Sequence, residues 1–144
     1  MWLADLAMIS KSAIQAIRAL TLLARLPENE FADARALAEK TGGASNYLGK
    51  LLQSLSRDGI VVSRKGLGGG FRLARPAKSI SLLDIVDSID PVVRWNGCFL
   101  GNENCSDENP CAMHKKWSKV RESYMKLLKK TSLADLAEHA EYGK

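Results

Sequence analysis

All three cysteines of the chain lie in one short polar stretch, CFLGNENCSDENPCAMH, which runs from Cys98 to His114. The acidic residues Glu103, Asp107 and Glu108 and a proline leave this stretch little with which to build a hydrophobic core. Three thiols cannot all pair in disulfides, and reducing compartments disfavour such bonds. Thiolate sulfur and imidazole nitrogen are, by contrast, ligands for zinc and for iron–sulfur clusters. The stretch therefore predicts a metal centre.

Two kinds of centre fit these ligands. Zinc would accept three thiolates and His114, but its usual cysteine pairs are separated by about two to four residues. Here six residues separate Cys98 from Cys105, and five separate Cys105 from Cys111. Iron–sulfur clusters are held by thiolates on irregular loops and also accept imidazole. The spacing favours iron–sulfur over zinc and leaves both open.

The excess positive charge is confined to one region. The chain carries a formal net charge of +5, and residues 45–75 alone hold six basic residues and the single acid Asp58. Elsewhere the basic and acidic residues cancel. A compact basic region is typical of a surface that binds an anionic partner, with a solvated charged face as the alternative.

The apolar spacing predicts the elements that position these residues. A helix is expected from Ser10 to about residue 25, with Ser10 or Ser12 as N-cap, followed by short helices over 33–41 and 45–57, the latter capped by Ser45. Two strands, 60–63 and 70–74, enclose the loop RKGLGG and form a hairpin. Further helices begin after Ser81, after the cysteines and after Ser132.

This order predicts a mainly α fold with a small β-wing. It is a winged helix-turn-helix with a long C-terminal dimerisation helix. We divide the chain into a winged helix-turn-helix DNA-binding domain (1–90), a cysteine-rich cluster-binding loop (91–112) and a part with the dimerisation and C-terminal helices (113–144).

The glycine-rich sequence GLGGG does not match a phosphate-binding loop, which would end in Gly-Lys-Ser/Thr and lead into a helix. It suits the tight tip of a hairpin whose cations enter a DNA minor groove, although a purely structural hairpin also fits. The helix over 45–57 is the expected recognition helix in the major groove. Alternatively, Tyr47 packs into the core and Asn46 only helps the cap. The predicted DNA contacts are Ser45, Asn46, Tyr47, Lys50, Arg57, Arg64, Lys65, Gly66 and Leu67.

An apolar seam follows the cysteines at spacings of 4, 3, 4 and 3 residues. Such a seam either packs within the chain or pairs two copies. A long helix after a compact winged domain has little left to cover within one chain, so we expect a homodimer with two recognition helices on successive major grooves. The seam consists of Met113, Trp117, Val120, Tyr124 and Leu127.

Several classes of protein are not expected. No apolar run approaches the roughly 18 residues of a membrane helix, and MWLADLAM lacks the basic start of a signal peptide. We therefore expect a soluble cytoplasmic protein without membrane partners. The chain offers no recognisable nucleophile–base pair or enclosed carboxylate set, so an enzyme is not expected.

The segments SNYLGKLLQSLSRDGIVVSRKGLGGGFRLARP and SISLLDIVDSID, followed by three cysteines, resemble the Rrf2 family of bacterial winged-helix transcription regulators, which includes IscR-like and NsrR-like members. The resemblance runs from about Ser10 to TSLADLAE. It implies a homodimer that binds a partly palindromic promoter site in double-stranded DNA and senses iron, redox state or nitric oxide through a cluster.

The resemblance also implies the ligands. The thiolates fall on Cys98, Cys105 and Cys111, and His114 matches the histidine that completes a [2Fe–2S] site in IscR-like members. NsrR-like members with a [4Fe–4S] cluster use an acid near the N-terminus, and the matching position here is Ile14. The [2Fe–2S] form is therefore favoured, with [4Fe–4S] as the alternative.

Two functions follow from the sequence. The first is a DNA-binding regulator switched by its cluster. The second is an iron–sulfur or zinc-binding redox or carrier protein without DNA binding. A steep salt dependence of binding to a promoter fragment distinguishes the first from the second.

Overall fold

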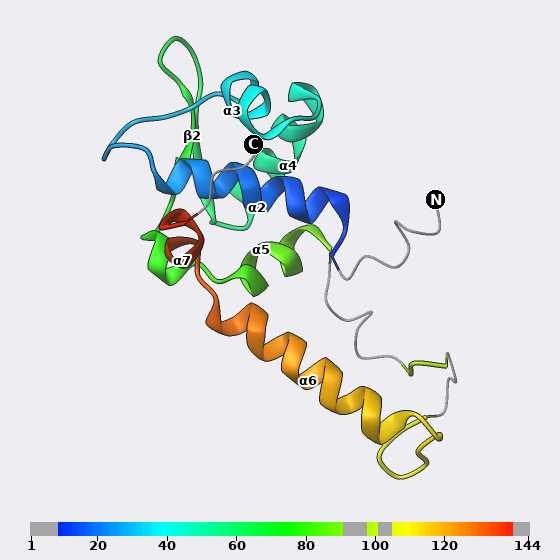
Figure 1. Ribbon diagram of the computed structural model, residues 1–144. Coiled ribbons are helices and arrows are strands. Elements are labelled where there is room, and N and C mark those ends of the chain that lie inside the picture. Colours follow the sequence, from blue (N-terminus) through cyan, green and yellow to red (C-terminus); the bar gives the residue numbers. More distant parts are fainter. Residues whose placement is uncertain (1–8, 91–97, 101–104, 140–144) are drawn as a thin grey trace.

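The computed structural model describes residues 9–90, 98–100 and 105–139 (Figure 1). The N-terminal stretch MWLADLAM and the part of the cysteine-rich loop with Glu103 lie outside the described residues. The elements, in chain order, are α2 (Lys11–Ala24), α3 (Ala34–Thr41), α4 (Ser45–Arg57), β1 (Val61–Arg64), β2 (Gly70–Leu73), the 3-10 helix η1 (Ala77–Ser79), α5 (Leu82–Ile89), α6 (His114–Lys130) and α7 (Leu133–Ala137). The predicted mainly α fold with a two-stranded wing is confirmed.

Polar side chains fix where the first helices start. Ser10 accepts a hydrogen bond from the Ala13 N–H at 3.1 Å, and Asp33 accepts one from the Ala36 N–H at 2.8 Å. The prediction that Ser45 caps α4 was wrong by one residue. Ala44 is the N-cap, and its carbonyl accepts the first helical bond from the Leu48 N–H at 3.0 Å. It makes no side-chain cap, because a methyl group has no hydrogen-bonding atom.

One hydrophobic core joins these helices. The inner face of α4 is fully buried against α2, as the spacing of its leucines predicts. Helix α5 adds Ile85 to this core, and the C-terminal region adds Leu128 and Leu133, each at most 1% exposed. The last part of the sequence therefore completes the core of the winged part.

The wing is an antiparallel hairpin whose register runs from Val61 opposite Leu73 to Arg64 opposite Gly70. The loop before α3 adds a bridge to it, because Ala32 and Phe71 exchange backbone hydrogen bonds of 3.0 and 2.8 Å. This approach requires glycine at position 70. Its φ is +131°, and a Cβ there would lie 2.4 Å from the Ala32 carbonyl oxygen.

Helix α6 projects away from the winged part, and the cysteine loop lies at its far end (Figure 1). Its other end is fastened to the start of α5. The Leu82 N–H donates to the Thr131 carbonyl at 2.9 Å, and the Leu133 N–H donates to the Ile80 carbonyl at 3.0 Å. Helix α7 then packs against α2. Within the described residues, no helix is long and apolar enough to cross a membrane.

Candidate metal centre and nucleic-acid interface

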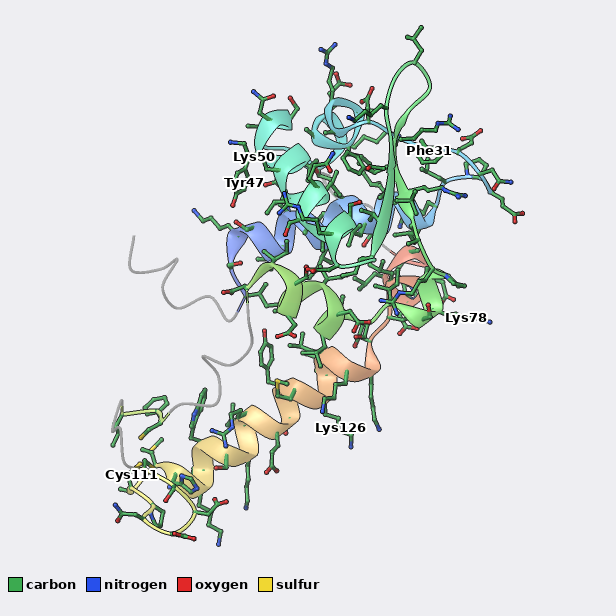
Figure 2. All side chains as sticks on the ribbon, turned by 180° about the vertical axis from the view of Figure 1, so that it is seen from behind. Phe31, Tyr47, Lys50, Lys78, Cys111 and Lys126 are labelled. Atoms are coloured by element: carbon green, nitrogen blue, oxygen red, sulfur yellow. The ribbon has the colours of Figure 1, made fainter. Side chains whose placement is uncertain are left out.

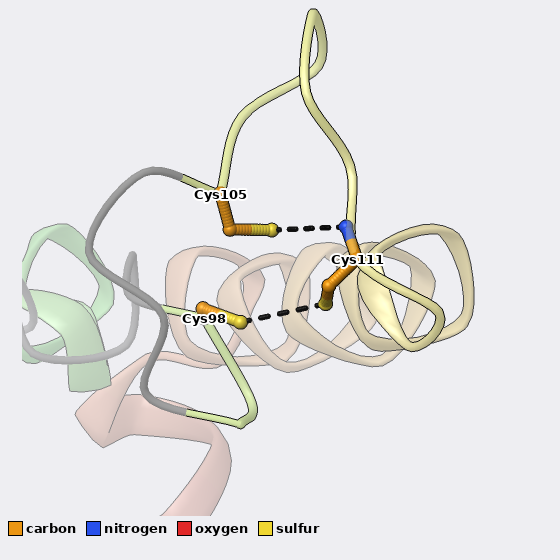
Figure 3. A group of neighbouring side chains, drawn as sticks. All are labelled: Cys98, Cys105 and Cys111. Carbon is orange, nitrogen blue, oxygen red and sulfur yellow. Dashed lines mark hydrogen bonds between the residues drawn. The ribbon is translucent and has the colours of Figure 1, made fainter.

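The three cysteines meet at the N-terminal end of α6 (Figure 3). All three Sγ atoms lie within 4.8 Å of one another, with Cys98 Sγ 3.5 Å from Cys111 Sγ. The Cys111 N–H donates to Cys105 Sγ at 3.4 Å, which holds the middle thiol against the last. Residues that the sequence separates by as many as thirteen positions thus form one sulfur-lined site.

His114, the first residue of α6, lies beside these sulfurs. Its Nδ1 is 3.3 Å from Cys105 Sγ, and its Nε2 is 2.8 Å from Asp107 Oδ1. The predicted fourth donor therefore lies next to the Cys105 thiol. Asp107 is a partner that the sequence reasoning did not assign to the site.

A tight turn shapes the loop between the second and third cysteines. The Ser106 N–H donates to the Asn109 carbonyl at 3.2 Å, and the Asn109 N–H donates to the Ser106 carbonyl at 3.1 Å. The His114 N–H then donates to the Cys111 carbonyl at 3.1 Å and begins the turn into α6. Asp107 lies inside the first turn, which brings its carboxylate to the imidazole.

Aromatic rings border the sulfurs. Phe99 and Trp117 form a tilted pair with centroids 5.5 Å apart. Both rings, together with Arg121, line a cavity of about 240 Å³ that also contains Cys98, Cys105 and His114. Apolar rings at a metal centre limit the access of water and influence its redox potential.

The protonation of Cys105 reflects its neighbours. The hydrogen bond from the Cys111 N–H lowers the pKa of the Cys105 thiol, but burial and the nearby Cys111 and Cys98 thiols outweigh it, so the pKa is raised. A raised pKa means that this thiol keeps its proton in the metal-free protein. Because thiolate is the form that binds metal, binding there releases a proton.

The donor set fits an iron–sulfur cluster. Three thiol sulfurs meet in one site, and the His114 Nδ1 lies beside one of them, Cys105 Sγ. The described part of the loop that carries the cysteines has no regular secondary structure, as is common for cluster loops. Zinc accepts the same donors.

A second site lies between α3, α4 and β2. Asn46, Lys50 and Arg57 line a shallow groove of about 720 Å³ there, with Ser45 at its end. Arg35 and Gln53 line the same groove, and the sequence reasoning missed both. Arg35 could have been predicted from its position in the first turn of α3, the first helix of the helix-turn-helix. A cation there faces the same partner as α4.

The groove depends on a close contact between its two helices. A Cβ built on Gly49 would lie 3.7 Å from the Ala34 Cβ, so these helices pack with almost no side chain between them. Four of the nine predicted DNA contacts share this groove with three further polar residues, Asp33, Arg35 and Gln53.

Tyr47 lies outside the groove lining. It is half exposed on the outer side of α4, next to Lys50 (Figure 2), and its hydroxyl group hydrogen-bonds with that of Ser12 at the start of α2. Tyr47 therefore links the recognition helix to α2 and does not pack into the core.

The tip of the wing presents Lys65, Gly66 and Leu67 to solvent. Arg64, at the end of β1, is also exposed, but its guanidinium contacts other parts of the chain. Its Nη2 donates to the Gly68 carbonyl at 2.9 Å, and its guanidinium lies 4.4 Å from the centre of the Phe31 ring.

The apolar seam of α6 is divided between two surroundings. Tyr124, at 8% exposed, is buried in the core of its own chain. Val120 and Leu127, at 50% and 57% exposed, lie on the surface, and Met113 and Trp117 are partly buried near the cysteines. Two apolar side chains are thus left uncovered within the described part of one chain.

A winged helix with a basic recognition helix defines a class of DNA-binding proteins. The chain belongs to the Rrf2 family, iron-dependent transcriptional regulators, whose family model matches residues 9–139.

Individual relatives agree with this assignment. A protein of Aquifex aeolicus (strain VF5), provisionally described as an HTH-type transcriptional regulator, is 34% identical over 92 residues, which cover 62% of this chain and 64% of that protein. The chain thus aligns with less than two thirds of that relative's length.

Solved structures share the fold. CymR (YrzC), the global cysteine regulator of B. subtilis, superposes with a TM-score of 0.78 at 24% identity, covering 94% of this chain and 99% of that one. IscR of T. potens superposes with a TM-score of 0.73 at 24% identity, covering 94% and 89%.

Proposed function

We propose that the chain is a DNA-binding regulator that senses iron, redox state or nitric oxide through an iron–sulfur cluster held by Cys98, Cys105 and Cys111. His114 is the proposed fourth ligand. The single observation that carries this proposal is the meeting of the three cysteine sulfurs, with the His114 Nδ1 beside Cys105 Sγ, in a chain of an iron-dependent regulator family. As such a regulator it acts in the cytoplasm, where the chromosome lies.

The ligand set supports a [2Fe–2S] cluster, with [4Fe–4S] as the alternative, because thiolate with imidazole ligation is known for the former. When bound, the cluster supplies a one-electron redox centre. An imidazole ligand also makes the site labile, because a proton competes with the metal for the nitrogen. Lability is useful in a sensor.

The DNA surface of the proposal combines the groove and the wing. Asn46 and Lys50 start the recognition helix on its exposed side, with Arg35 and Arg57 along the same groove. Asn pairs at two points with adenine, and Lys binds guanine or phosphate. Lys65 at the wing tip supplies a cation for the backbone or minor groove. Two copies joined through α6 would present two such surfaces.

Anaerobic reconstitution tests the cluster. Wild type and the variants Cys98→Ser, Cys105→Ser, Cys111→Ser and His114→Ala are loaded with iron and sulfide, and both elements are counted. We expect each cysteine variant to lose the cluster and His114→Ala to keep a weaker or altered one. Glu108→Gln is the matched control, because it changes an exposed residue of the same loop and should load like wild type.

Titration of a promoter fragment tests the regulation. Holo and apo forms are compared at several salt concentrations, with and without nitric oxide or oxygen. We expect a steep salt dependence and a difference in affinity or sequence preference between the two forms. Equal binding of every operator by both forms contradicts the sensor. Uptake of zinc without sulfide, or binding that does not depend on salt, favours the metal or redox carrier.

A further inference from the structure

We propose that Asp107 is a positioning residue for the metal centre. Its carboxylate fixes the ring of His114 so that Nδ1, and not Nε2, is the nitrogen presented to the site. This inference rests on the proposed function, because it concerns how the fourth ligand is oriented.

The first step concerns the proton on the imidazole. Asp107 Oδ1 lies 2.8 Å from His114 Nε2, and an ionised carboxylate only accepts hydrogen bonds. In the neutral ring, which carries a single N–H, that hydrogen must therefore reside on Nε2. The lone pair is then left on Nδ1.

The second step concerns where that lone pair lies. His114 Nδ1 is 3.3 Å from Cys105 Sγ, on the side of the ring that faces the thiols. The His114 side chain is only 18% exposed, whereas the Asp107 side chain is fully exposed. The carboxylate thus approaches the ring from the solvent side, while the ring itself lies inside the site. Metal-bound histidines commonly carry such a carboxylate on the other nitrogen, which sets the ring orientation and the basicity of the ligand.

The third step concerns the loop. The reciprocal hydrogen bonds between Ser106 and Asn109 close a turn that contains both Asp107 and Glu108. Both acids are exposed, but the structure gives only Asp107 a contact with the imidazole. The turn therefore distinguishes two neighbouring carboxylates, and Glu108 is a natural control for Asp107.

The test uses full-length protein reconstituted anaerobically. The variants are Asp107→Ala, Asp107→Asn, Glu108→Gln and His114→Ala. Histidine labelled with ¹⁵N at either Nδ1 or Nε2 is incorporated, and pulsed electron paramagnetic resonance of the reduced cluster identifies the bound nitrogen. The rate of iron release to a chelator and the midpoint potential are measured on the same samples.

We expect the strong nitrogen coupling in wild type to come from Nδ1. Asp107→Ala should broaden or weaken that coupling and speed iron release on the order of 10-fold, the lower end of the effect of removing an outer-shell partner. Its midpoint potential should rise, because a negative charge beside the ligand is lost. Asp107→Asn, which can still accept a hydrogen bond but carries no charge, should fall between Ala and wild type. Glu108→Gln should match wild type.

Several results overturn the inference. Coupling from Nε2 in wild type contradicts the proposed ring orientation. If Asp107→Ala and Glu108→Gln change the coupling, the rate of iron release and the midpoint potential equally, Asp107 acts only as a nearby negative charge and does not position the ring. An unchanged spectrum in His114→Ala removes His114 as a ligand while the cluster itself stands. A wild-type protein that takes up no iron and sulfide instead defeats the proposed function, and the positioning role with it.

Discussion

Arg64 carries a positive charge on the wing, but its guanidinium is already engaged. It donates to the Gly68 carbonyl and lies over Phe31, whose ring also has the Arg72 guanidinium 5.2 Å from its centre. A planar guanidinium suits this arrangement, because it stacks on aromatic faces while donating in its own plane. Arg64 therefore holds the shape of the wing although it is exposed, and Lys65 is a second exposed cation beside it.

Two single substitutions distinguish these roles. Lys65→Ala should lower the slope of log affinity against log salt by about 0.9 for one lost phosphate contact. Arg64→Lys keeps the charge but loses the planar guanidinium that stacks on Phe31. It should therefore weaken DNA binding without changing the slope of log affinity against log salt. Fluorescence anisotropy at four salt concentrations measures both. A lower slope in Arg64→Lys would mean that Arg64 contacts phosphate directly.

For individual residues, the sequence indicated the candidate metal ligands better than the residues that contact them. The three thiols and His114 were found because their residue types carry the chemistry. Asp107 was not, because seven positions and a tight turn separate it from His114 and nothing in the spacing favours it over Glu108. The sequence also did not reveal that Arg64 lies over Phe31, because Phe31 comes from a loop more than thirty residues earlier.

Among the elements, the wing shows why the glycine run is needed within the chain itself. The sequence indicated glycines for the tight tip of a hairpin whose cations enter a DNA minor groove. In the structure, a Cβ on Gly69 would lie 2.2 Å from the Arg64 carbonyl oxygen, and one on Gly70 would meet the Ala32 backbone. The close approach that these two glycines allow is to their own chain.

Gly70→Ala should therefore destabilise the protein. The positive φ and the backbone contact together are expected to lower the free energy of unfolding by about 1–3 kcal/mol. Gly66→Ala is the control, because Gly66 also has a positive φ, +88°, but a Cβ there meets nothing within 4 Å. Urea unfolding followed by circular dichroism compares the two. If Gly66→Ala lowers the free energy of unfolding as much as Gly70→Ala does, the positive φ alone accounts for the loss and the contact with Ala32 does not contribute.

Helix α6 shows where periodicity stops being informative. The spacing correctly predicted a long amphipathic helix, but it could not decide which apolar residues face the chain's own core. Packing against α5 buries Tyr124 and Leu128, one residue beyond the predicted Leu127. Only the position of α5, which depends on the whole fold, makes that choice.

For the whole molecule, the exposed side of α6 is the surface that a second copy would cover. Val120→Asp should split the proposed dimer, because burying an unpaired carboxylate costs several kcal/mol. Sedimentation velocity should then show a monomer that binds the operator weakly. Lys129→Asp places the same charge at an exposed position of the same helix, on the side opposite Val120 and Leu127, and should stay dimeric. A dimer in both variants would place the interface elsewhere.

The shared core leads to a prediction about stability. Leu133 is fully buried, so Leu133→Ala should lower the free energy of unfolding by about 2–5 kcal/mol and unfold the winged part with it. The C-terminal region and the recognition helix should unfold together in one transition. Alanine at the partly buried Leu136 is the milder comparison. Two separate transitions would mean that the C-terminal region folds independently.

The bridge between Ser81 and Ser132 has a mechanical consequence. It fixes the C-terminal end of α6 to the winged part, and the 17 residues of the helix extend from there to the cysteines. Such a helix is an arm about 25 Å long, so a tilt of roughly 10° about its fastened end sweeps the far end through about 4 Å. Conversely, a displacement of about 4 Å at the sulfurs corresponds to a rotation of roughly 10° at the fastened end of α6. The cysteines thus lie at the far end of α6, and the helix is fastened at its other end, beside the core that also contains the inner face of the recognition helix.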